Sequence, residues 1–261
     1  MPVDEHYSDA RLASIYDVVN PPTPDLAFYR RLASGGPKRI CDLGCGTGRL
    51  AADLATDGHT VTGVDPAPAM LDVARNRHGG DLVRWIQDDA RSVDAGGPFD
   101  LIVMTGHVFQ VFRTDDDLRA VLRNARRHLS TEGRFAFETR NPSVREWDEW
   151  NPDDSAERVD VPGGVGPVDV VYEVLAEELP LVTFEARFGF VRSGLTLASR
   201  STLRFWSRDE LERHLADAGL EAIEWLGDFD GTPISDVSPE IVVISGRADR
   251  SPGRSLDVNG A

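Results

Sequence analysis

The sequence predicts an α/β fold in which a parallel sheet is covered by helices on both faces and carries an inserted antiparallel β-meander. From residue 39 to residue 137, short apolar runs alternate with amphipathic helical patterns, as in successive β–α–β units. Between residues 168 and 206 the helical period disappears, and three apolar runs follow one another with short connections. A helical pattern and two more apolar runs then follow as far as residue 247.

The first part of the chain supplies five expected strands, at residues 40–43, 60–64, 82–86, 101–104 and 134–137. Helices are expected at 49–55, from Pro68 onward and at 116–129, with Gly58 and Gly133 ending the first and the last of them. Two N-terminal helices, at 9–18 and 25–32, are separated by the proline-rich residues 20–24 because proline interrupts helical hydrogen bonding.

The change of period divides the second part into an insertion and a return to the core. Residues 143–160 are expected to form an acidic loop, and strands are expected at 168–175, 181–190 and 195–205. Ser207 and Glu210 form a helix capping box, Gly219 ends that helix, and strands follow at 221–225 and 240–244. The expected units are an N-terminal helical lid (1–35), a core (36–142), an inserted β subdomain (143–206), the completion of the core (207–247) and a disordered tail (248–261).

Composition and charge narrow the classes of partner. The chain of 261 residues has 28 Lys and Arg against 44 Asp and Glu, a formal net charge of −16. Because such an acidic surface repels nucleic-acid phosphates and anionic membranes, we expect neither as a partner. The sequence has no run of 18 apolar residues and no recognisable secretory signal, and its two cysteines, Cys41 and Cys45, lack a metal-site pattern. We therefore expect a cytoplasmic protein without a metal, as a monomer or homodimer.

The most informative segment is ICDLGCGTG at residues 40–48, between an expected strand and an expected helix. Gly44, Gly46 and Gly48 allow a tight turn and let a ligand lie against bare backbone. Their spacing is neither the G-x-G-x-x-G of dinucleotide-binding folds nor a phosphate-binding P-loop. A carboxylate at Asp42 would repel a pyrophosphate and suits a ligand that is positively charged at that point. The alternative is a plain tight turn.

Two further acidic positions follow the next two strands. Asp65 is placed to accept hydrogen bonds from ribose hydroxyls, although it could also cap the following helix. Asp89 could accept from the exocyclic amine of adenine while a neighbouring backbone N–H, as at Ala90, donates to the ring; the alternative is an exposed loop. A cationic amino-acid end, a ribose and an adenine together describe S-adenosylmethionine (SAM).

The segments DLGCGTG, VDPAPAML, QDDA and FDLIVMTGHVFQVF, in this order and spacing, resemble the class I SAM-dependent methyltransferases. The resemblance covers about residues 36–142 and resumes at 207–247. It implies a Rossmann-like seven-stranded sheet of order 3-2-1-4-5-7-6 with the last strand antiparallel. It also implies the following contacts to SAM: Gly44 and Gly46 to its methionine part, Asp65 to the ribose, Met70, Asp89 and Ala90 to the adenine, the Thr105 carbonyl to the amino group, Gly106 and His107 at the methyl end, and Tyr16 as a lid tyrosine.

On the acceptor side, His107 has the pKa range of a general base, although it could instead only hydrogen-bond SAM or the backbone. Arg140 follows the fifth strand and could clamp a substrate carboxylate, or pair with Glu138 or the acidic 146–160 loop. Arg140-Asn141 is similar to a pair in glycine N-methyltransferases, but this chain has His107, Val108 and Pro142 where those have Asn, Ser and Tyr. Phe109, Trp147 and Trp150 are candidates for aromatic walls or packing anchors.

We therefore expect an enzyme that transfers the methyl group of SAM to an N or O atom of a small molecule, with S-adenosylhomocysteine (SAH) as the second product. If the acceptor carries a carboxylate, we expect Arg140 to bind it. The alternatives are a SAM-binding enzyme of other chemistry, such as cyclisation or lysis of SAM, and an RNA or protein methyltransferase. The insertion is expected to be a substrate lid or a dimer surface.

Overall fold

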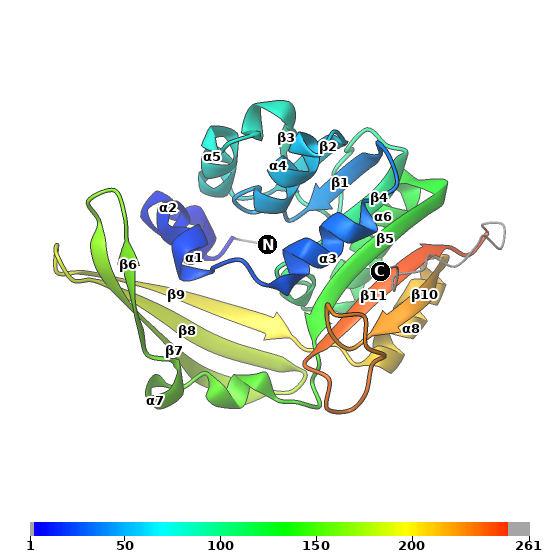
Figure 1. The fold of residues 1–261 in the computed structure, drawn as a ribbon. Helices are drawn as coiled ribbons and strands as arrows, with labels where there is room; N and C mark the ends of the chain where they lie inside the picture. The colour runs from blue at the N-terminus through cyan, green and yellow to red at the C-terminus, as the bar shows by residue number, and fades with distance from the viewer. Residues whose placement is uncertain (1–2, 250–261) are drawn as a thin grey trace.

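The computed structural model describes residues 3–249, and its core is a seven-stranded sheet (Figure 1). The strands of this sheet are β1 (Arg39–Leu43), β2 (Thr60–Asp65), β3 (Arg84–Gln87), β4 (Phe99–Met104), β5 (Leu129–Arg140), β10 (Leu220–Leu226) and β11 (Glu240–Arg247). Their spatial order is β3-β2-β1-β4-β5-β11-β10, and β11 runs antiparallel to both of its neighbours. The predicted sheet order and its antiparallel last strand are therefore confirmed.

Helices cover both faces of this sheet, as predicted. Alternate side chains of each buried strand point to opposite faces, so neighbours such as Ile40 and Cys41 belong to different apolar clusters. One face packs against α6 (Asp115–His128) and α8 (Arg208–Asp217). The other face packs against α3 (Pro24–Leu32) and α4 (Arg49–Thr56). Outside the insertion, the other helical segments of residues 3–249 are α1 (Glu5–Ser8), α2 (Ala10–Val19), α5 (Pro68–Asn76), η1 (Gly80–Leu82) and η2 (Val108–Val111).

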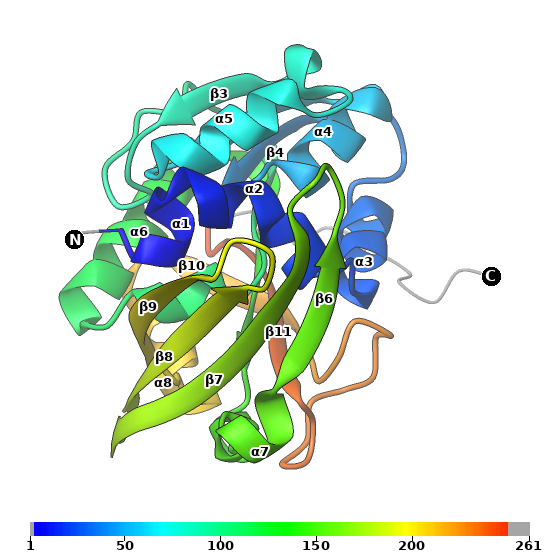
Figure 2. The same ribbon diagram turned by 90° about the vertical axis from the view of Figure 1, so that its left-hand side faces the viewer.

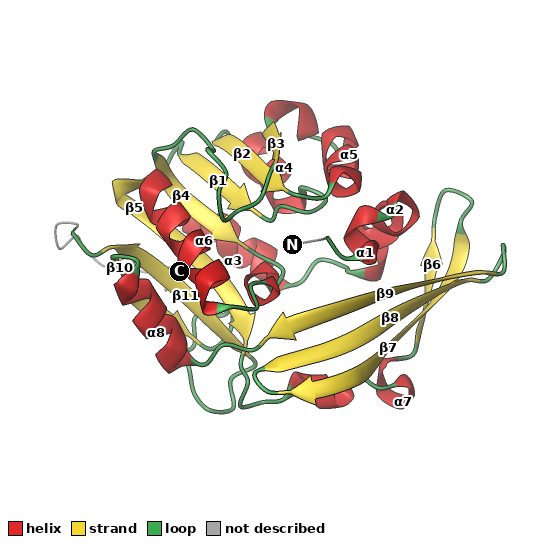
Figure 3. Cartoon of the chain, turned by 180° about the vertical axis from the view of Figure 1, so that it is seen from behind, coloured by secondary structure: helices red, strands yellow, loops and turns green. Residues whose placement is uncertain are grey.

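The insertion is a separate four-stranded antiparallel sheet (Figures 2 and 3). Its strands, in spatial order, are β6 (Glu157–Val161), β7 (Gly166–Glu178), β8 (Leu181–Phe190) and β9 (Leu195–Arg204). The prediction of a loop over 143–160 is wrong, because η3 (Glu146–Glu149), α7 (Pro152–Ser155) and β6 lie there. Strand β6 was missed because its exposed acidic side chains obscure a period of two, and only its pairing with β7 makes it a strand.

The two faces of the inserted sheet differ in chemistry. Along β8, buried residues such as Phe184 and Phe188 alternate with partly exposed ones, and this apolar face packs against Leu12 and Ile15 of α2. On the opposite face, Arg187 forms ion pairs with Glu173 and Glu185. Figure 1 shows α1 and α2 between this sheet and the core. The apolar face is thus directed inward and the charged face outward.

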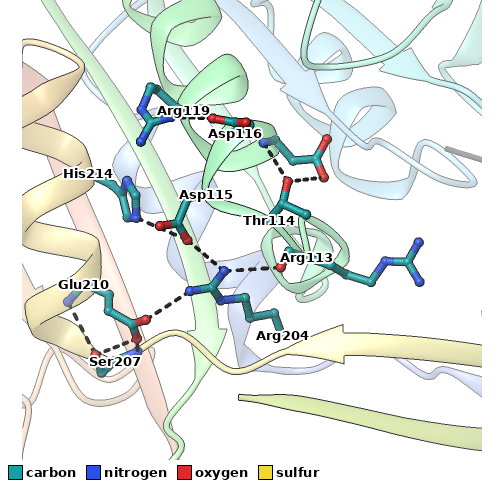
Figure 4. Close-up of polar contacts among 10 residues, drawn as sticks. Arg113, Thr114, Asp115, Asp116, Arg119, Arg204, Ser207, Glu210 and His214 are labelled. Atoms are coloured by element: carbon teal, nitrogen blue, oxygen red, sulfur yellow. Dashed lines mark hydrogen bonds and ion pairs between the residues drawn. The ribbon is translucent and has the colours of Figure 1, made fainter. Parts of the chain in front are cut away.

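A polar joint connects the inserted sheet to the core (Figure 4). Arg204, at the end of β9, donates to Asp115 Oδ1 at 2.8 Å and to Glu210 Oε1 at 3.1 Å. Glu210 also completes the predicted capping box of α8 with Ser207. The first turns of α6 and α8 are therefore bound to the same guanidinium.

Two details of the expected boundaries change. Gly133 does not end α6, because β5 begins at Leu129 directly after the helix and includes Gly133. Glycine is required there by space, since a Cβ would lie 2.7 Å from the Phe99 carbonyl oxygen. Most of the tail expected to be disordered, residues 250–261, lies outside the described residues. Between residues 3 and 249, no helix is long and apolar enough to cross a membrane.

Candidate active site

The glycine-rich loop after β1 adopts the tight turn that its sequence predicts. Gly44, Gly46 and Gly48 have φ values of +76°, +52° and +72°. The N–H groups of Gly44 and Cys45 donate to the Val64 carbonyl at 2.7 and 3.0 Å, which binds the loop to the end of β2. A Cβ added at Gly44 would lie 2.5 Å from Val108, whereas one added at Gly46 would meet no atom within 4 Å. Open space for a ligand against bare backbone is therefore found at Gly46.

Asp65, the last residue of β2, holds this loop in place. One carboxylate oxygen accepts from the Gly46 N–H at 2.9 Å and the other from the Ala67 N–H at 2.8 Å. Each oxygen has a second lone pair that is still available to a hydroxyl group. Burial raises the pKa of Asp65, and the two backbone hydrogen bonds oppose that rise. Ala67, not Asp65, is the N-cap residue of α5.

Asp42 is a buried carboxylate that lacks a full set of partners. Its side chain is almost fully buried, and its Oδ1 has no hydrogen-bond partner within residues 3–249. Burial raises the pKa of Asp42 to about 7, and the nearby Asp65 and Glu138 add to the rise. A carboxylate in this state would be stabilised by a bound cation, as the sequence analysis anticipated.

The residues expected around adenine lie at the ends of β2 and β3. Met70 is buried in α5, in a cluster that includes Ala67 and Tyr16. Asp89 accepts from both the backbone N–H and the Nε of Arg91 at 2.9 Å, and this bond to Arg91 lowers the pKa of Asp89. Its carboxylate is therefore ionised and oriented. The carbonyl of the buried Ala90 accepts from Asn124.

The N-terminal helices are attached directly to the glycine loop. Asp17 in α2 accepts from the Thr47 hydroxyl at 2.6 Å and pairs with Arg49 at 3.1 Å and with Arg77. Tyr16, beside it, is partly buried, and its burial raises its pKa to about 12. Asp17 was not anticipated, because an isolated acid on a helix carries no recognisable pattern. These contacts place α2 against the loop that is expected to hold SAM.

On the other side of β1, the loop after β4 is held by buried acids. His107 has a φ of +58°, unusual for a residue other than glycine. Its N–H donates to Glu138 Oε1 at 2.9 Å, and Tyr29 donates its hydroxyl hydrogen to the other oxygen of Glu138. The His107 ring nitrogen Nε2 lies 2.8 Å from Glu240 Oε1. Burial, together with the charge of Arg140, lowers the pKa of His107 to about 4.

Glu138 and Glu240 are acids of this group that sequence reasoning did not assign to the site. Burial raises the pKa of Glu138 to about 7 and that of Glu240 to about 8. Glu240 Oε2 is buried and has no partner among the residues that the structure describes. The pairing of β11 with β5 places Glu240 opposite Arg140, which is why no local motif could have indicated it.

Arg140 pairs with the acidic loop, one of the two alternatives left open by the sequence. Its Nε donates to Glu146 Oε1 at 2.8 Å and its Nη1 donates to Gln110 Oε1 at 2.9 Å. Its guanidinium carbon lies 5.3 Å from the centre of the Trp150 ring. Its Nη2 has no hydrogen-bond partner among residues 3–249. Gln110, fully buried in η2, was not anticipated either.

Two of the three aromatic candidates serve as packing anchors. Phe109 is buried and stacks on Phe137, with ring centres 4.0 Å apart. Trp147 is buried against Phe205. Trp150 alone of the three lies beside a charged group of the site, Arg140.

The site is therefore assembled from the carboxyl ends of five neighbouring strands, where open α/β sheets bind ligands. Most of the expected SAM contacts lie at or just after the ends of β3, β2 and β1; those expected at the amino group and the methyl end, Thr105, Gly106 and His107, follow β4; and Arg140 ends β5. Two observations fit SAM: the orphaned carboxylate oxygen of Asp42 and the open space at Gly46 and Gly106, where an added Cβ would meet nothing within 4 Å.

Known proteins resemble this chain in sequence, some over the core and others over most of its length. A family model described as a methyltransferase domain matches residues 40–133. Cypemycin N-terminal methyltransferase from a Streptomyces species is 26% identical over 254 residues, which are 92% of this chain and 98% of that protein. Putative methyltransferase YqeM from Bacillus subtilis is 29% identical over 130 residues, or 48% of this chain; the match spans only about half of that relative's length, 53%.

A solved structure extends the likeness to the inserted sheet. The CcbJ methyltransferase from Streptomyces caelestis superposes with a TM-score of 0.75 over 91% of this chain and 96% of that one. Its sequence identity of 22% makes this a likeness of fold.

Proposed function

Because the chain belongs to the class I SAM-dependent methyltransferases, we propose that it transfers the methyl group of SAM to an amine nitrogen of a small-molecule acceptor and releases SAH. The family accounts for the cofactor and the reaction type. The choice of an amine over a hydroxyl is our inference from the charges beyond β1. It agrees with the name of the cypemycin relative, an N-terminal methyltransferase.

One observation carries the proposal: carboxylates outnumber cations where the acceptor would bind. Most of the expected SAM contacts lie at the ends of β3, β2 and β1, and those at the methyl end follow β4, so the acceptor side lies beyond them, over β4, β5 and β11. Glu138 and Glu240 are buried there, and the neighbouring Arg140 is already paired with Glu146. Buried acids with raised pKa values favour a ligand that brings positive charge, because the ligand would stabilise their ionised form. An ammonium group meets that condition.

The roles of the chain's own residues follow from this placement. SAM supplies a methyl group that is already activated by its bond to a sulfonium. Asp65 would hold the ribose, Asp42 would stabilise the cationic end, and the loop at Gly46 would lie against the methionine part. What remains is to align the acceptor and exclude water. The inserted sheet suits a lid, since its apolar face is directed toward α2 and its ion-paired face outward.

We further propose that Arg140 binds a carboxylate when the acceptor has one. Glu146 and Gln110 occupy Nε and Nη1 and orient the guanidinium, leaving Nη2 for the acceptor. Arg140→Ala should then raise KM for L-alanyl-L-alanine at least tenfold and leave KM for L-alanyl-L-alaninamide, which lacks the carboxylate, nearly unchanged. Equal effects on both peptides would reduce Arg140 to a structural partner of the acidic loop.

The proposed function is tested by product analysis. The protein is incubated with SAM and, separately, with D-glucosamine, L-alanyl-L-alanine and catechol. We expect SAH with the amines and little with catechol. SAH with catechol alone would contradict the choice of nitrogen, and methylthioadenosine would indicate cyclisation or lysis of SAM. A nucleic-acid acceptor is disfavoured by the net charge of −16.

A further inference from the structure

We propose that the carboxylate of Glu240, supported by the ring of His107, accepts the proton that the acceptor's ammonium group must lose before methyl transfer. This inference rests on the proposed transfer to nitrogen. It assigns a catalytic role to a residue that lies in none of the sequence motifs, 133 positions after His107.

The position of Glu240 is the first support. It begins β11, and its pairing with Arg140 at the end of β5 places it at the edge of the sheet where the acceptor would bind. One carboxylate oxygen lies 2.8 Å from His107 Nε2. The other, Oε2, is buried and has no partner anywhere in residues 3–249. A buried acceptor atom without a donor is costly, so a donor from the ligand would relieve it.

The surroundings of Glu240 adjust its proton affinity. The charged and titratable groups that face it or its partners are Asp25 and Tyr29 from α3, His107 after β4, Glu138 and Arg140 from β5, Glu146 from η3 and Asp228 after β10. Burial raises the pKa of Glu240 to about 8; Arg140 opposes the rise, and Glu146, Asp228 and Asp25 add to it. The pKa of Glu240 is therefore much closer to that of an ammonium group than the pKa of an ordinary carboxylate is.

His107 is the weaker candidate for the same role. Burial lowers its pKa to about 4, so its ring is neutral and holds an additional proton poorly. Its backbone N–H donates to Glu138, and its ring nitrogen Nε2 lies 2.8 Å from Glu240. We therefore assign His107 as the group that orients Glu240.

The proton and electron pairs balance without another reactant. The ammonium group of the acceptor gives one proton to Glu240, and the freed lone pair forms a bond to the methyl carbon. The bond between that carbon and sulfur breaks, and its electron pair stays on the sulfur as neutral SAH is formed. The acceptor leaves as a methylated ammonium ion, and Glu240 passes its proton to solvent.

The test is the dependence of kcat on pH at saturating SAM, with D-glucosamine or L-alanyl-L-alanine, whichever releases SAH faster. We expect Glu240→Gln to lower kcat about tenfold near pH 7, where about a tenth of such an amine is already free. Its activity should approach the wild-type value near pH 10, where the free amine is already deprotonated. SAH affinity, measured by calorimetry, should change less than twofold. Glu240→Asp should restore part of the activity, and His107→Asn, which tolerates the positive φ, should give a smaller loss.

Glu221→Gln is the matched control, since Glu221 is exposed on the neighbouring strand β10. A Glu240→Gln protein with wild-type kcat and an unchanged pH profile would overturn the assignment while leaving amine methylation intact. So would a failure of Glu240→Asp to exceed Glu240→Gln, because a purely structural role would not require an acid. If the wild type releases SAH with neither amine, the proposed N-methyl transfer itself fails.

Discussion

Two polar clusters of this protein, one with the half-buried Glu210 and one with the buried Glu240, differ in how charge is balanced. At the joint of the inserted sheet, Arg204 pairs with Glu210 and Asp115 (Figure 4). Its guanidinium carbon lies 3.6 Å from the centre of the Trp206 ring. At the acceptor side, Glu240 lies beside a neutral histidine, and the neighbouring Arg140 is bonded to Glu146.

The pKa values follow from this difference. Burial raises the pKa of Glu210, but hydrogen bonds from Ser207 and the pairing with Arg204 outweigh it, so the net shift is downward. For Glu240 the charge of Arg140 is too weak to offset the effect of burial, and the pKa rises to about 8. A balanced cluster is typical of a structural joint, whereas an unbalanced one is poised to bind a cation or take a proton.

The largest expected effect is a loss of SAH binding caused by a substitution in the glycine-rich loop. Gly46→Val should weaken SAH binding at least 100-fold, because the side chain would enter the open space beside the loop and resist a φ of +52°. Calorimetry measures the affinity. Gly58→Val is the matched control, since Gly58 also has a positive φ and open space but lies after α4, away from the site. If Gly46→Val and Gly58→Val bind SAH equally well, the loop does not hold the cofactor.

Asp65→Ala should weaken SAH binding tenfold or more, since hydrogen bonds to a charged acceptor contribute about 1.5–3 kcal/mol. The variant also frees the N–H groups of Gly46 and Ala67, so thermal unfolding should be followed in parallel. Asp81→Ala removes an exposed carboxylate from η1 and should leave the affinity unchanged. Normal SAH binding by folded Asp65→Ala protein would exclude the ribose role.

Arg204→Met tests the balanced cluster. It removes the guanidinium from Asp115 and Glu210 but keeps much of the packing on Trp206. Because Asp115 is half-exposed and partly screened, we expect a loss of about 1–3 kcal/mol in the free energy of unfolding. Urea denaturation measures it. SAH affinity should stay within twofold; a tenfold loss would mean that the joint also shapes the active site.

The smallest expected effect is on the pH dependence of stability. The pKa of folded Glu240 is raised, so its contribution is full below the unfolded value near 4.5 and is lost as the pH rises through about 8. Glu240→Gln should therefore reduce the fall in unfolding free energy between pH 6 and pH 8.5 by roughly 1–2 kcal/mol. Glu210, with its lowered pKa, should instead lose its contribution as the pH falls below its unfolded value. An unaltered slope in Glu240→Gln would contradict the raised pKa.

The residues proposed for the cofactor side of the site were predicted from the sequence by itself. Asp42, Gly46 and Asp65 stand at or directly after apolar strands, and parallel strands end at the same edge of a sheet. Their chemistry could therefore be interpreted from spacing within short segments. The alternation of strands and helices predicted the core sheet for the same reason, since each β–α–β unit is a local pattern.

Only the tertiary structure decided the acceptor side. Glu240 meets His107 because β11 pairs with β5, and Tyr29 reaches Glu138 across 109 positions of sequence. Strand β6 likewise depends on its pairing with β7. Local sequence propensity does not indicate which distant carboxylates will be buried close to one another. Their raised pKa values depend on that proximity, because they arise from burial together with unbalanced charge. Local sequence thus determined the loop that we propose holds SAM, and long-range strand pairing determined the position of the proposed proton acceptor.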